Sequence, residues 1–556
     1  MLRSLTLAVA LLSSTAALAA PVADLIIRDA HIVTVDSNFS IAQAAAIQGG
    51  RFIAVGTDAE VLKTKGPNSR IIDLHGRTIL PGFNDTHVHL TAGEELPLEV
   101  DLTHIRSIKD IQAAIAARAK EMKAGEWIVG TRGWWEYQLA ENRLPTRADL
   151  DAAAPDNPVA IPGPHYVIAN SLALKLAGVT RDTPDPQGGQ IYKDSKGEPT
   201  GLLMDNASRF IRKFLPHPTE AQKEAGLKRV LALVNSHGLT SAGDPSGSPS
   251  DAALFRKLRD QGQLTVRVDF AYDIDPAEPL DKVEAQLKAL PRPGSDGDGM
   301  FRSDEIGETG LDGAELTAFL EHDYPGKPGY RGLQKVPNEQ FERFAALVAK
   351  YHYRLRPHAV GDAAIDEALD AFDYANKQAP ITKRRWMIDH AFLLGPRHYA
   401  RVKRLGLIIN SQYMHNYELG ALILKAWKRP LADRSEPYAE WLKNGIMFAG
   451  GSDGPISYHA EPLLEIYGEV TRGTQWGGRL GPDQGISRQA AIRSVTINGA
   501  FTTFEEKVKG SIEPGKYADF VVLSADILKA PAEKIRDLKI LATVLGGRTV
   551  YGSLGE

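Results

Sequence analysis

The sequence predicts an α/β protein, in which a (β/α)8 barrel is joined to a small β domain built from both ends of the chain. From Pro81 to about Ser494, helical stretches alternate with short apolar strands, which is typical of a parallel sheet covered by helices. Near both chain ends, strand-like segments follow one another too closely for helices to lie between them. At this length a barrel is the leading interpretation, and an open doubly wound sheet is the alternative.

The small β domain is predicted from segments at opposite ends of the chain. They are rich in Ile and Val, and Gly49-Gly50 supplies a turn. Their short spacing indicates an antiparallel sheet. The expected strands lie within Asp24–Asp36, Ala44–Val55, Arg70–Leu74, Asp519–Leu523 and Ala542–Leu545. The expected domains are therefore residues 21–80 and 496–556 for the β domain and 81–495 for the barrel.

The barrel is predicted from a longer series of elements. Helices are expected at Lys109–Lys123, Thr219–His237 and Asn338–Tyr351, and strands at Thr265–Tyr272, Arg354–His358, Trp386–His390, Gly406–Asn410 and Ile446–Gly451. Residues 104–206 are rich in Gly and Pro and interrupt this pattern. We expect them to form a large insertion near the mouth of the barrel.

The composition excludes several classes of site. The 556 residues contain 65 Lys and Arg against 69 Asp and Glu, a net charge of −4, and no cysteine. This balance gives no basic surface for nucleic acid. Without cysteine there is no disulfide, no thiolate nucleophile and no cysteine zinc site, so any metal ion must be held by His, Asp and Glu.

The first 20 residues are typical of a signal peptide. Arg3 supplies a positive charge, Leu5–Leu12 is apolar, and Ala17-Leu18-Ala19 matches the A-x-A cleavage pattern. The apolar run is too short to span a bilayer, and no later stretch is long and apolar enough to do so. We therefore expect a secreted or periplasmic protein, cleaved near Ala19 or Ala20.

The segment Ile79–Leu90 (ILPGFNDTHVHL) contains His87 and His89, separated by one residue. Alternate side chains of a strand point to the same face, so a strand ending here directs both imidazoles to one point. Imidazole is a good ligand for zinc and related ions. His-x-His alone is a weak motif, and two polar residues on a half-buried strand are the alternative.

Later segments also place ligand-type side chains just after apolar strands. In a barrel the C-terminal strand ends form one face, so these side chains are expected to converge there. A single strand-end histidine is usually structural, but four histidines and two carboxylates in series favour a metal site. The segments contain Glu305-Ile306-Gly307-Glu308, His358, Asp389-His390 and Ser452-Asp453.

These motifs resemble the metal-dependent amidohydrolase superfamily, in the amidohydrolase family 3 branch that contains N-substituted formamide deformylase-like enzymes. The resemblance covers nearly the whole mature chain and implies a distorted (β/α)8 barrel beside a composite β-sandwich. Besides 79–90 it rests on LPTRADLDAAAP (144–155), HGLTSAGD (237–244), HAVGDAAIDEALDAF (358–372), IDHA (388–391), GGSDGPI (450–456) and GSIEPGKYADFVVL (510–523).

The resemblance also implies roles for the polar residues. His87, His89 and Asp453 would bind the more buried of two divalent ions, and His358 and His390 the more exposed one. Asp453 would also move a proton from the attacking water to the leaving group. One or two ions are expected; zinc is the default, and manganese, iron or cobalt suit the same ligands.

Glu308 is where this chain departs from the commoner pattern of the branch, Lys-x-x-x-Asp-Gly. The sequence here is Glu308-Thr-Gly-Leu-Asp312-Gly313. In other superfamily members that lysine is carbamylated and bridges the two ions, whereas Glu308 already carries a carboxylate. A glutamate is shorter, so its strand must lie closer or be shifted. The alternatives are that Glu308 lies beside a one-metal site, or that Glu305 replaces it.

Three residues are expected to line the substrate pocket. His165, in Ile-Pro-Gly-Pro-His-Tyr, matches a family position that usually reads Asp-Gly-His and faces the substrate, although Pro164 departs from it. Trp134 and Trp135 in the insertion can form an apolar wall, and core packing is the alternative.

The function implied is metal-dependent hydrolysis of a C–N bond of amide type, other than a peptide bond, in a small molecule. Ester or phosphoester hydrolysis at the same site is one alternative, and a secreted binding protein without turnover is another from a different class. The expected partner is a small-molecule substrate, with no nucleic acid and no membrane span. Self-association into a homo-oligomer stays open.

Overall fold

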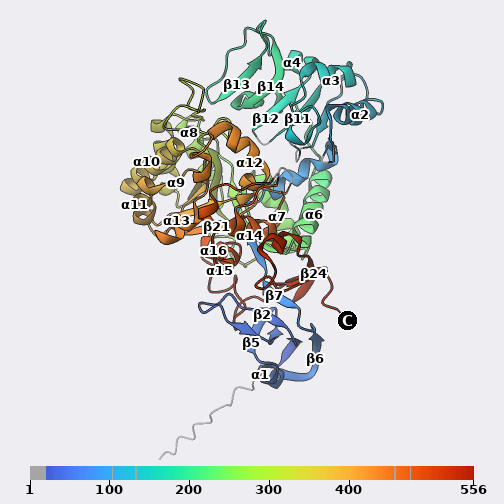
Figure 1. The fold of residues 1–556 in the computed structure, drawn as a ribbon, viewed down its shortest axis with the longest axis vertical. Helices are drawn as coiled ribbons and strands as arrows, with labels where there is room; N and C mark the ends of the chain where they lie inside the picture. The colour runs from blue at the N-terminus through green and yellow to red at the C-terminus, as the bar shows by residue number, and fades with distance from the viewer. Residues whose placement is uncertain are drawn as a thin grey trace, which may run out of the picture.

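The computed structural model describes residues 21–555, except for 103, 132–133, 135, 164, 456–458 and 476, and gives the backbone alone for 95–97 and 137. The signal-peptide prediction and Trp135 therefore lie outside the described residues. The molecule is elongated, with the small β domain at one end, the barrel in the middle and the insertion at the other end (Figure 1).

The centre of the molecule is an eight-stranded parallel sheet that curls into a barrel. Its strands follow one another in chain order, whereas a doubly wound sheet reverses its order. A hydrogen bond from the Thr86 amide to the Gly450 carbonyl (3.2 Å) links its two edges. The strands are β8 Phe83–Asp85, β15 Leu239–Gly247, β16 Arg267–Tyr272, β17 Phe301–Gly310, β18 Arg354–Ala359, β19 Met387–His390, β20 Ile408–Ser411 and β21 Phe448–Gly450. The predicted (β/α)8 barrel is confirmed.

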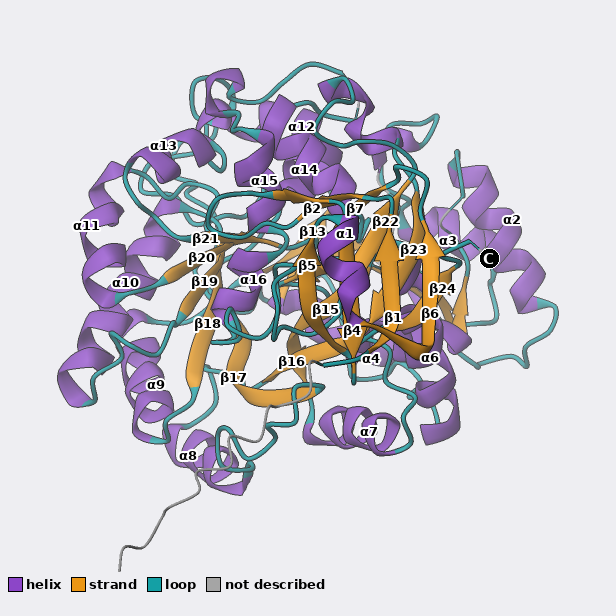
Figure 2. Ribbon diagram, turned by 90° about the horizontal axis from the view of Figure 1, so that it is seen from below, coloured by secondary structure: helices purple, strands orange, loops and turns teal. Residues whose placement is uncertain are grey.

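Helices cover the outside of the barrel (Figure 2). In α9 (Asn338–Lys350), Phe341, Phe344, Ala345 and Val348 recur at helical spacing and are buried, so one face of the helix packs on the sheet. The other helices around the barrel include α6 Glu220–Ser236, α7 Pro249–Asp260, α8 Leu280–Ala289, α10 Asp362–Gln378, α11 Pro396–Leu405, α12 Tyr413–Trp427 and α14 Pro462–Thr471. Their buried faces and the strands form one large hydrophobic cluster.

The insertion lies between β8 and β15 and builds a sheet of its own. The order β13-β14-β12-β11-β10-β9 mixes parallel and antiparallel pairs. The strands are β9 Glu99–Val100, β10 Ile128–Gly130, β11 Val159–Pro162, β12 Tyr166–Ala169, β13 Gly189–Lys193 and β14 Pro199–Asp205, and the helices are α2 Ile108–Ala119, α3 Arg147–Ala153 and α4 Ser171–Ala177. Figure 1 shows this layer beyond the barrel, on the side away from the small β domain.

The small β domain contains two sheets with a shared apolar core. One has the order β5-β4-β1-β6, and the other, β24-β23-β22-β7-β2-β3, pairs strands from both chain ends. Leu25, Ile47, Phe520 and Val544 meet in the core between them. The strands are β1 Ala23–Arg28, β2 His31–Val33, β3 Ile41–Ala42, β4 Ala44–Gln48, β5 Arg51–Gly56, β6 Lys65–Asp73, β7 Thr78–Pro81, β22 Phe520–Leu523, β23 Ile540–Leu545 and β24 Arg548–Gly552.

The expected antiparallel pairing is wrong for part of this domain. β1 pairs with β6 in parallel, and so does β2 with β7. The short helix α1 (Asp58–Val61) and the turn after it carry the chain from β5 to β6, next to β1. This segment was too short to indicate a crossover from the sequence.

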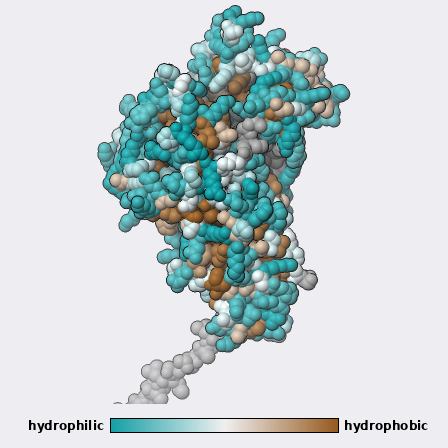
Figure 3. All heavy atoms as spheres, in the orientation of Figure 1, coloured by the Kyte–Doolittle hydropathy of each residue, from teal (hydrophilic) through white to brown (hydrophobic). Residues whose placement is uncertain are grey.

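Hydrophilic side chains cover most of the visible face of the molecule (Figure 3). Among the described residues, no helix is both long and apolar enough to cross a membrane.

Candidate active site

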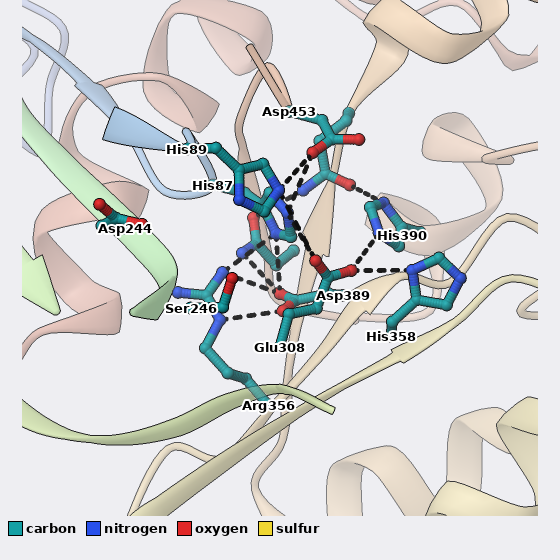
Figure 4. Close-up of polar contacts among 12 residues, drawn as sticks. His87, His89, Asp244, Ser246, Glu308, Arg356, His358, Asp389, His390 and Asp453 are labelled. Carbon is teal, nitrogen blue, oxygen red and sulfur yellow. Dashed lines mark hydrogen bonds and ion pairs between the residues drawn. The ribbon is translucent and has the colours of Figure 1, made fainter. Parts of the chain in front are cut away.

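Polar side chains from five barrel segments converge at the C-terminal ends of the strands (Figure 4). They border a cavity of about 560 Å³, which is within the usual range for a small-molecule site. Its lining includes His89, Glu308, His358, His390 and Asp453. The structure therefore brings together the side chains that the sequence placed after separate strands.

His87 and His89 lie just beyond β8, in an extended segment held by the backbone. The Val88 amide donates to Gly243 (2.9 Å), and the His89 amide donates to Gly454 (2.7 Å). Asp85 fixes the start of this segment, because its Oδ1 accepts from the amides of both His87 (3.1 Å) and Ser452 (3.0 Å). The imidazole of His87 is completely buried, while that of His89 reaches the cavity.

Glu308 lies between two pairs of histidines. Its Oε1 is 2.8 Å from both His358 Nδ1 and His390 Nε2. Its Oε2 is 3.6 Å from His87 Nε2 and 3.7 Å from His89 Nε2. Burial opposes ionisation of Glu308, but the charge of His87 and the hydrogen bonds from His358 and His390 hold its pKa well below the usual value. Each carboxylate oxygen of Glu308 thus faces one pair of histidines.

An irregularity in β17 aims Glu308 into the cavity. The register between β17 and β18 shifts between Ile306 and Thr309, around Glu308. Such a bulge redirects a side chain that a regular strand would point elsewhere.

The alternative that Glu305 replaces Glu308 is wrong. Glu305 is buried inside the barrel, where its carboxylate contacts Arg354 (2.5 Å) and Arg356 (3.2 Å). It belongs to a group of buried carboxylates with Asp269 and Asp304, whose charges these arginines balance. Glu305 therefore lies on the barrel interior, away from the histidines.

Asp453 contacts the first histidine pair from the opposite side. Its Oδ1 is 2.9 Å from His89 Nε2 and 3.4 Å from His87 Nε2. Burial opposes ionisation, but the hydrogen bond from His415 and the nearby imidazoles of His87 and His89 hold the pKa of Asp453 well below its usual value. Asp453 is therefore an ionised carboxylate whose Oδ1 faces His87 and His89.

His415, in the first turn of α12, is a functional candidate that the sequence reasoning missed. Its Nε2 is 3.0 Å from Asp453 Oδ2, and its Nδ1 is 3.4 Å from Glu315 Oε1. Burial lowers the pKa of His415, but the two carboxylates raise it to about 10, so the imidazole is protonated. The one feature of the sequence that could have identified His415 is its position, a few residues after the predicted strand Gly406–Asn410.

A second set of buried groups orients the histidines. Asp389 receives two hydrogen bonds from Arg356 (2.9 and 3.0 Å) and lies 3.5 Å from His87 Nδ1. On the other side, Gln412 Oε1 is 2.7 Å from His390 Nδ1 and accepts a hydrogen bond from it. These partners fix the orientation of each ring, with Nε2 directed toward Glu308.

Two of the converging residues have unusual backbone conformations. His390 has φ of 70° and Asp453 has φ of 58°, in the left-handed region that non-glycine residues seldom adopt. Strain of this kind persists where the surrounding structure fixes it, and it gathers at functional sites.

The donor set fits a divalent metal ion. The ligand-type atoms of His87, His89 and Asp453 lie within 4.8 Å of one another, and so do those of His87, Glu308 and His390. His87 Nε2 is buried without a hydrogen-bond partner among the described residues, although it faces two carboxylates. A buried polar atom without a partner is costly, and coordination would satisfy it. Imidazole and carboxylate ligands suit zinc, manganese, iron and cobalt.

The predicted pocket residues lie in different places. His165 lines the cavity, where its Nδ1 contacts Asp205 (3.0 Å) and its ring centroid is 5.1 Å from that of His358. Trp134 is buried in the core of the insertion, and its Nε1 donates to the Thr131 carbonyl (3.1 Å). Trp134 therefore has the packing role that was the alternative to an apolar wall.

A profile of the amidohydrolase family matches residues 70–551. The chain belongs to the amidohydrolase family. N-substituted formamide deformylase from Arthrobacter pascens is 27% identical over 553 residues, which cover 96% of this chain and 99% of the relative. YtcJ of Bacillus subtilis (strain 168), an amidohydrolase by name, is 31% identical and covers 88% of this chain and 93% of its own. The predicted family branch is confirmed.

Solved structures support the fold. A metal-dependent hydrolase from Pyrococcus furiosus superimposes with a TM-score of 0.68 and 24% identity, over 91% of this chain and 100% of that one. At this sequence identity, the similarity supports only the fold, that is, the barrel and its additional domains.

Proposed function

We propose that this amidohydrolase is a metal-dependent enzyme that cleaves a C–N bond of amide type in a small molecule. The observation that carries the proposal is the buried His87 Nε2, which lacks a hydrogen-bond partner among the described residues and faces both Glu308 and Asp453. The likeness to N-substituted formamide deformylase over nearly the whole chain supports an amide substrate.

The proposed ligands form two groups. His87, His89 and Asp453 would hold one ion, His358 and His390 would hold a second, and the Glu308 carboxylate lies between the two groups. We propose zinc as the ion. The chemistry that a divalent ion supplies when bound in such a site is a water molecule of lowered pKa and a polarised carbonyl oxygen.

The chain's own groups move the protons. Asp453 accepts a proton from the attacking water and returns it to the departing nitrogen, which is general acid–base catalysis by one carboxylate. His415 holds Asp453 Oδ2 at 3.0 Å, so that Oδ1 stays beside His89. His165, oriented by Asp205, contacts the substrate from the cavity wall.

The proposal is tested by loading the purified protein with zinc, manganese, cobalt or iron in turn. Each form is then assayed with N-formyl and N-acyl amines, esters and phosphoesters. The expected result is amide hydrolysis that a chelator abolishes and added metal restores. Hydrolysis of esters or phosphoesters alone would overturn the amide assignment. Metal binding with no turnover of any substrate would favour a binding protein.

A further inference from the structure

A second cavity adjoins the candidate active site. It measures about 660 Å³ and shares Asn206, Arg209, Ala277 and Lys335 with the first cavity. It lies where α5 (Arg209–Arg212) of the insertion meets the segments before α8 and α9 of the barrel. The two cavities therefore lie side by side, with these four residues between them.

The walls of the second cavity combine apolar surface with positive charge. Pro186, Phe210, Pro279 and Pro337 supply the apolar part. Arg209, Lys213 and Lys335 also line it, while no carboxylate is among its described lining residues. An occupant of matching chemistry has an apolar body and an anionic group.

The ion pairs show which of these cations is uncompensated. Arg209 Nη1 pairs with Asp275 (2.7 Å), and Lys335 Nζ pairs with the buried Asp205 (3.0 Å). For Lys213 the structure records no ion pair with a described residue; its ammonium lies 5.1 Å from the centroid of the Phe214 ring. Lys213 is also exposed, so a ligand can reach it. Among the three cations that line the cavity, Lys213 is thus the one without a recorded ion pair to a described residue.

We infer that the substrate is an amide with an apolar arm that ends in a carboxylate, and that this arm occupies the second cavity with its carboxylate at Lys213. The inference rests on the proposed amide hydrolysis. The scissile bond lies in the first cavity beside Glu308 and Asp453, and the arm passes between them and Lys213 along Arg209 and Lys335. Arg209 has further N–H groups that can join Lys213 on the carboxylate.

The test compares two substrates that differ only at the end of the arm. They are the N-formyl derivative of 4-(4-aminobutyl)benzoic acid and that of the corresponding benzyl alcohol. The ratio of their kcat/KM values, acid over alcohol, is measured for the metal-loaded protein. We expect a ratio of roughly two to five, the effect of one exposed ion pair, and a decrease with added salt.

Three variants locate the effect. Lys213→Gln should bring the ratio close to one, and Lys213→Arg should retain it. Lys175→Gln, at an exposed lysine on α4 that lines neither cavity, should keep the parental ratio. A ratio of one or less in the parent, or an unchanged ratio in Lys213→Gln, would overturn the inference.

Calorimetric binding separates this inference from the proposed function. If neither substrate is hydrolysed, the amide function fails, but both compounds can still be titrated into the metal-loaded protein. If the acid binds more tightly than the alcohol and Lys213→Gln abolishes this difference, the anionic arm is supported. Equal affinity for acid and alcohol would exclude it.

Discussion

His415 Nε2 lies 3.0 Å from Asp453 Oδ2, while the other carboxylate oxygen of Asp453 faces His89 at 2.9 Å. A protonated imidazole thus holds the proposed base on the side away from the histidine pair. This contact fixes the direction in which Asp453 can exchange a proton. His415 is therefore a positioning residue that acts through Asp453.

Replacing His415 with Gln should lower kcat by about 10–100-fold, because an outer partner of a metal-site group typically has that effect. The metal content should remain near the parental value, since Asp453 Oδ1 keeps its contacts. Elemental analysis and steady-state kinetics measure the two quantities. His322→Gln, at an exposed histidine, is the control and should match the parent. Parental kcat in His415→Gln would exclude the positioning role.

Asp453→Asn should abolish turnover and preserve the fold, since an amide cannot accept the proton. Circular dichroism checks the fold, and the amide assay checks turnover. Activity within a few-fold of the parent would show that another group carries the proton.

His87→Ala should lose metal and activity together. The completely buried His87 Nε2 lies between the Glu308 and Asp453 carboxylates, 3.6 and 3.4 Å away, so the substitution removes the imidazole that faces both of them. Metal content by elemental analysis and turnover are measured on the same preparation. If both are unchanged, the site assignment is wrong.

Glu367 on α10 should make the fold less stable at alkaline pH. Burial, followed by the charge of Asp312, raises its pKa to about 8 from the usual 4.5. Because the folded pKa is the higher one, the stability contributed by protonated Glu367 is fully present below pH 4.5 and is lost as pH rises to about 8.

Glu367→Gln should therefore raise the free energy of unfolding at pH 8 by about 1–3 kcal/mol, with a smaller effect at pH 5. Denaturant titrations at the two pH values measure the difference. Asp182→Asn, at an exposed loop residue, is the control. An equal effect of Glu367→Gln at both pH values would show that the carboxyl group does not titrate in this range.

Much of the fold and of the candidate site could be predicted because the ends of the barrel strands can be recognised in the sequence. His390 ends β19 and His358 is the next-to-last residue of β18, and the rule that such ends converge placed them together. His415 escaped this reasoning because it lies within a helix that begins after β20. Asp85 was hidden for another reason: its role is to join two backbone segments that are distant in sequence.

The internal fold of the insertion could not be predicted because its strands are short and its pairing is mixed. β9 has two residues and β10 has three, and neither is long enough to show a period. The partners of β14 include β12 and β13, and no turn motif in the sequence specified both. The second cavity depends on how this sheet meets the barrel, so it also lay beyond sequence reasoning.

Glu308 distinguishes this chain from relatives with a carbamylated lysine, which depends on dissolved carbon dioxide. Metal reconstitution should therefore be insensitive to bicarbonate. Glu308→Gln removes the negative charge between the two histidine pairs. It should first weaken binding of the ion at His358 and His390. Elemental analysis after reconstitution, with and without bicarbonate, measures both effects. A requirement for bicarbonate in the parent would contradict the role of Glu308.

A crystal structure of the zinc-loaded protein with anomalous scattering data would show directly whether Glu308 bridges two ions. We predict two anomalous peaks, one beside His87, His89 and Asp453 and one beside His358 and His390. A Glu308 oxygen should lie at roughly 2.0–2.2 Å from each ion. A Glu308 carboxylate turned away from every ion would show that Glu308 does not bridge them.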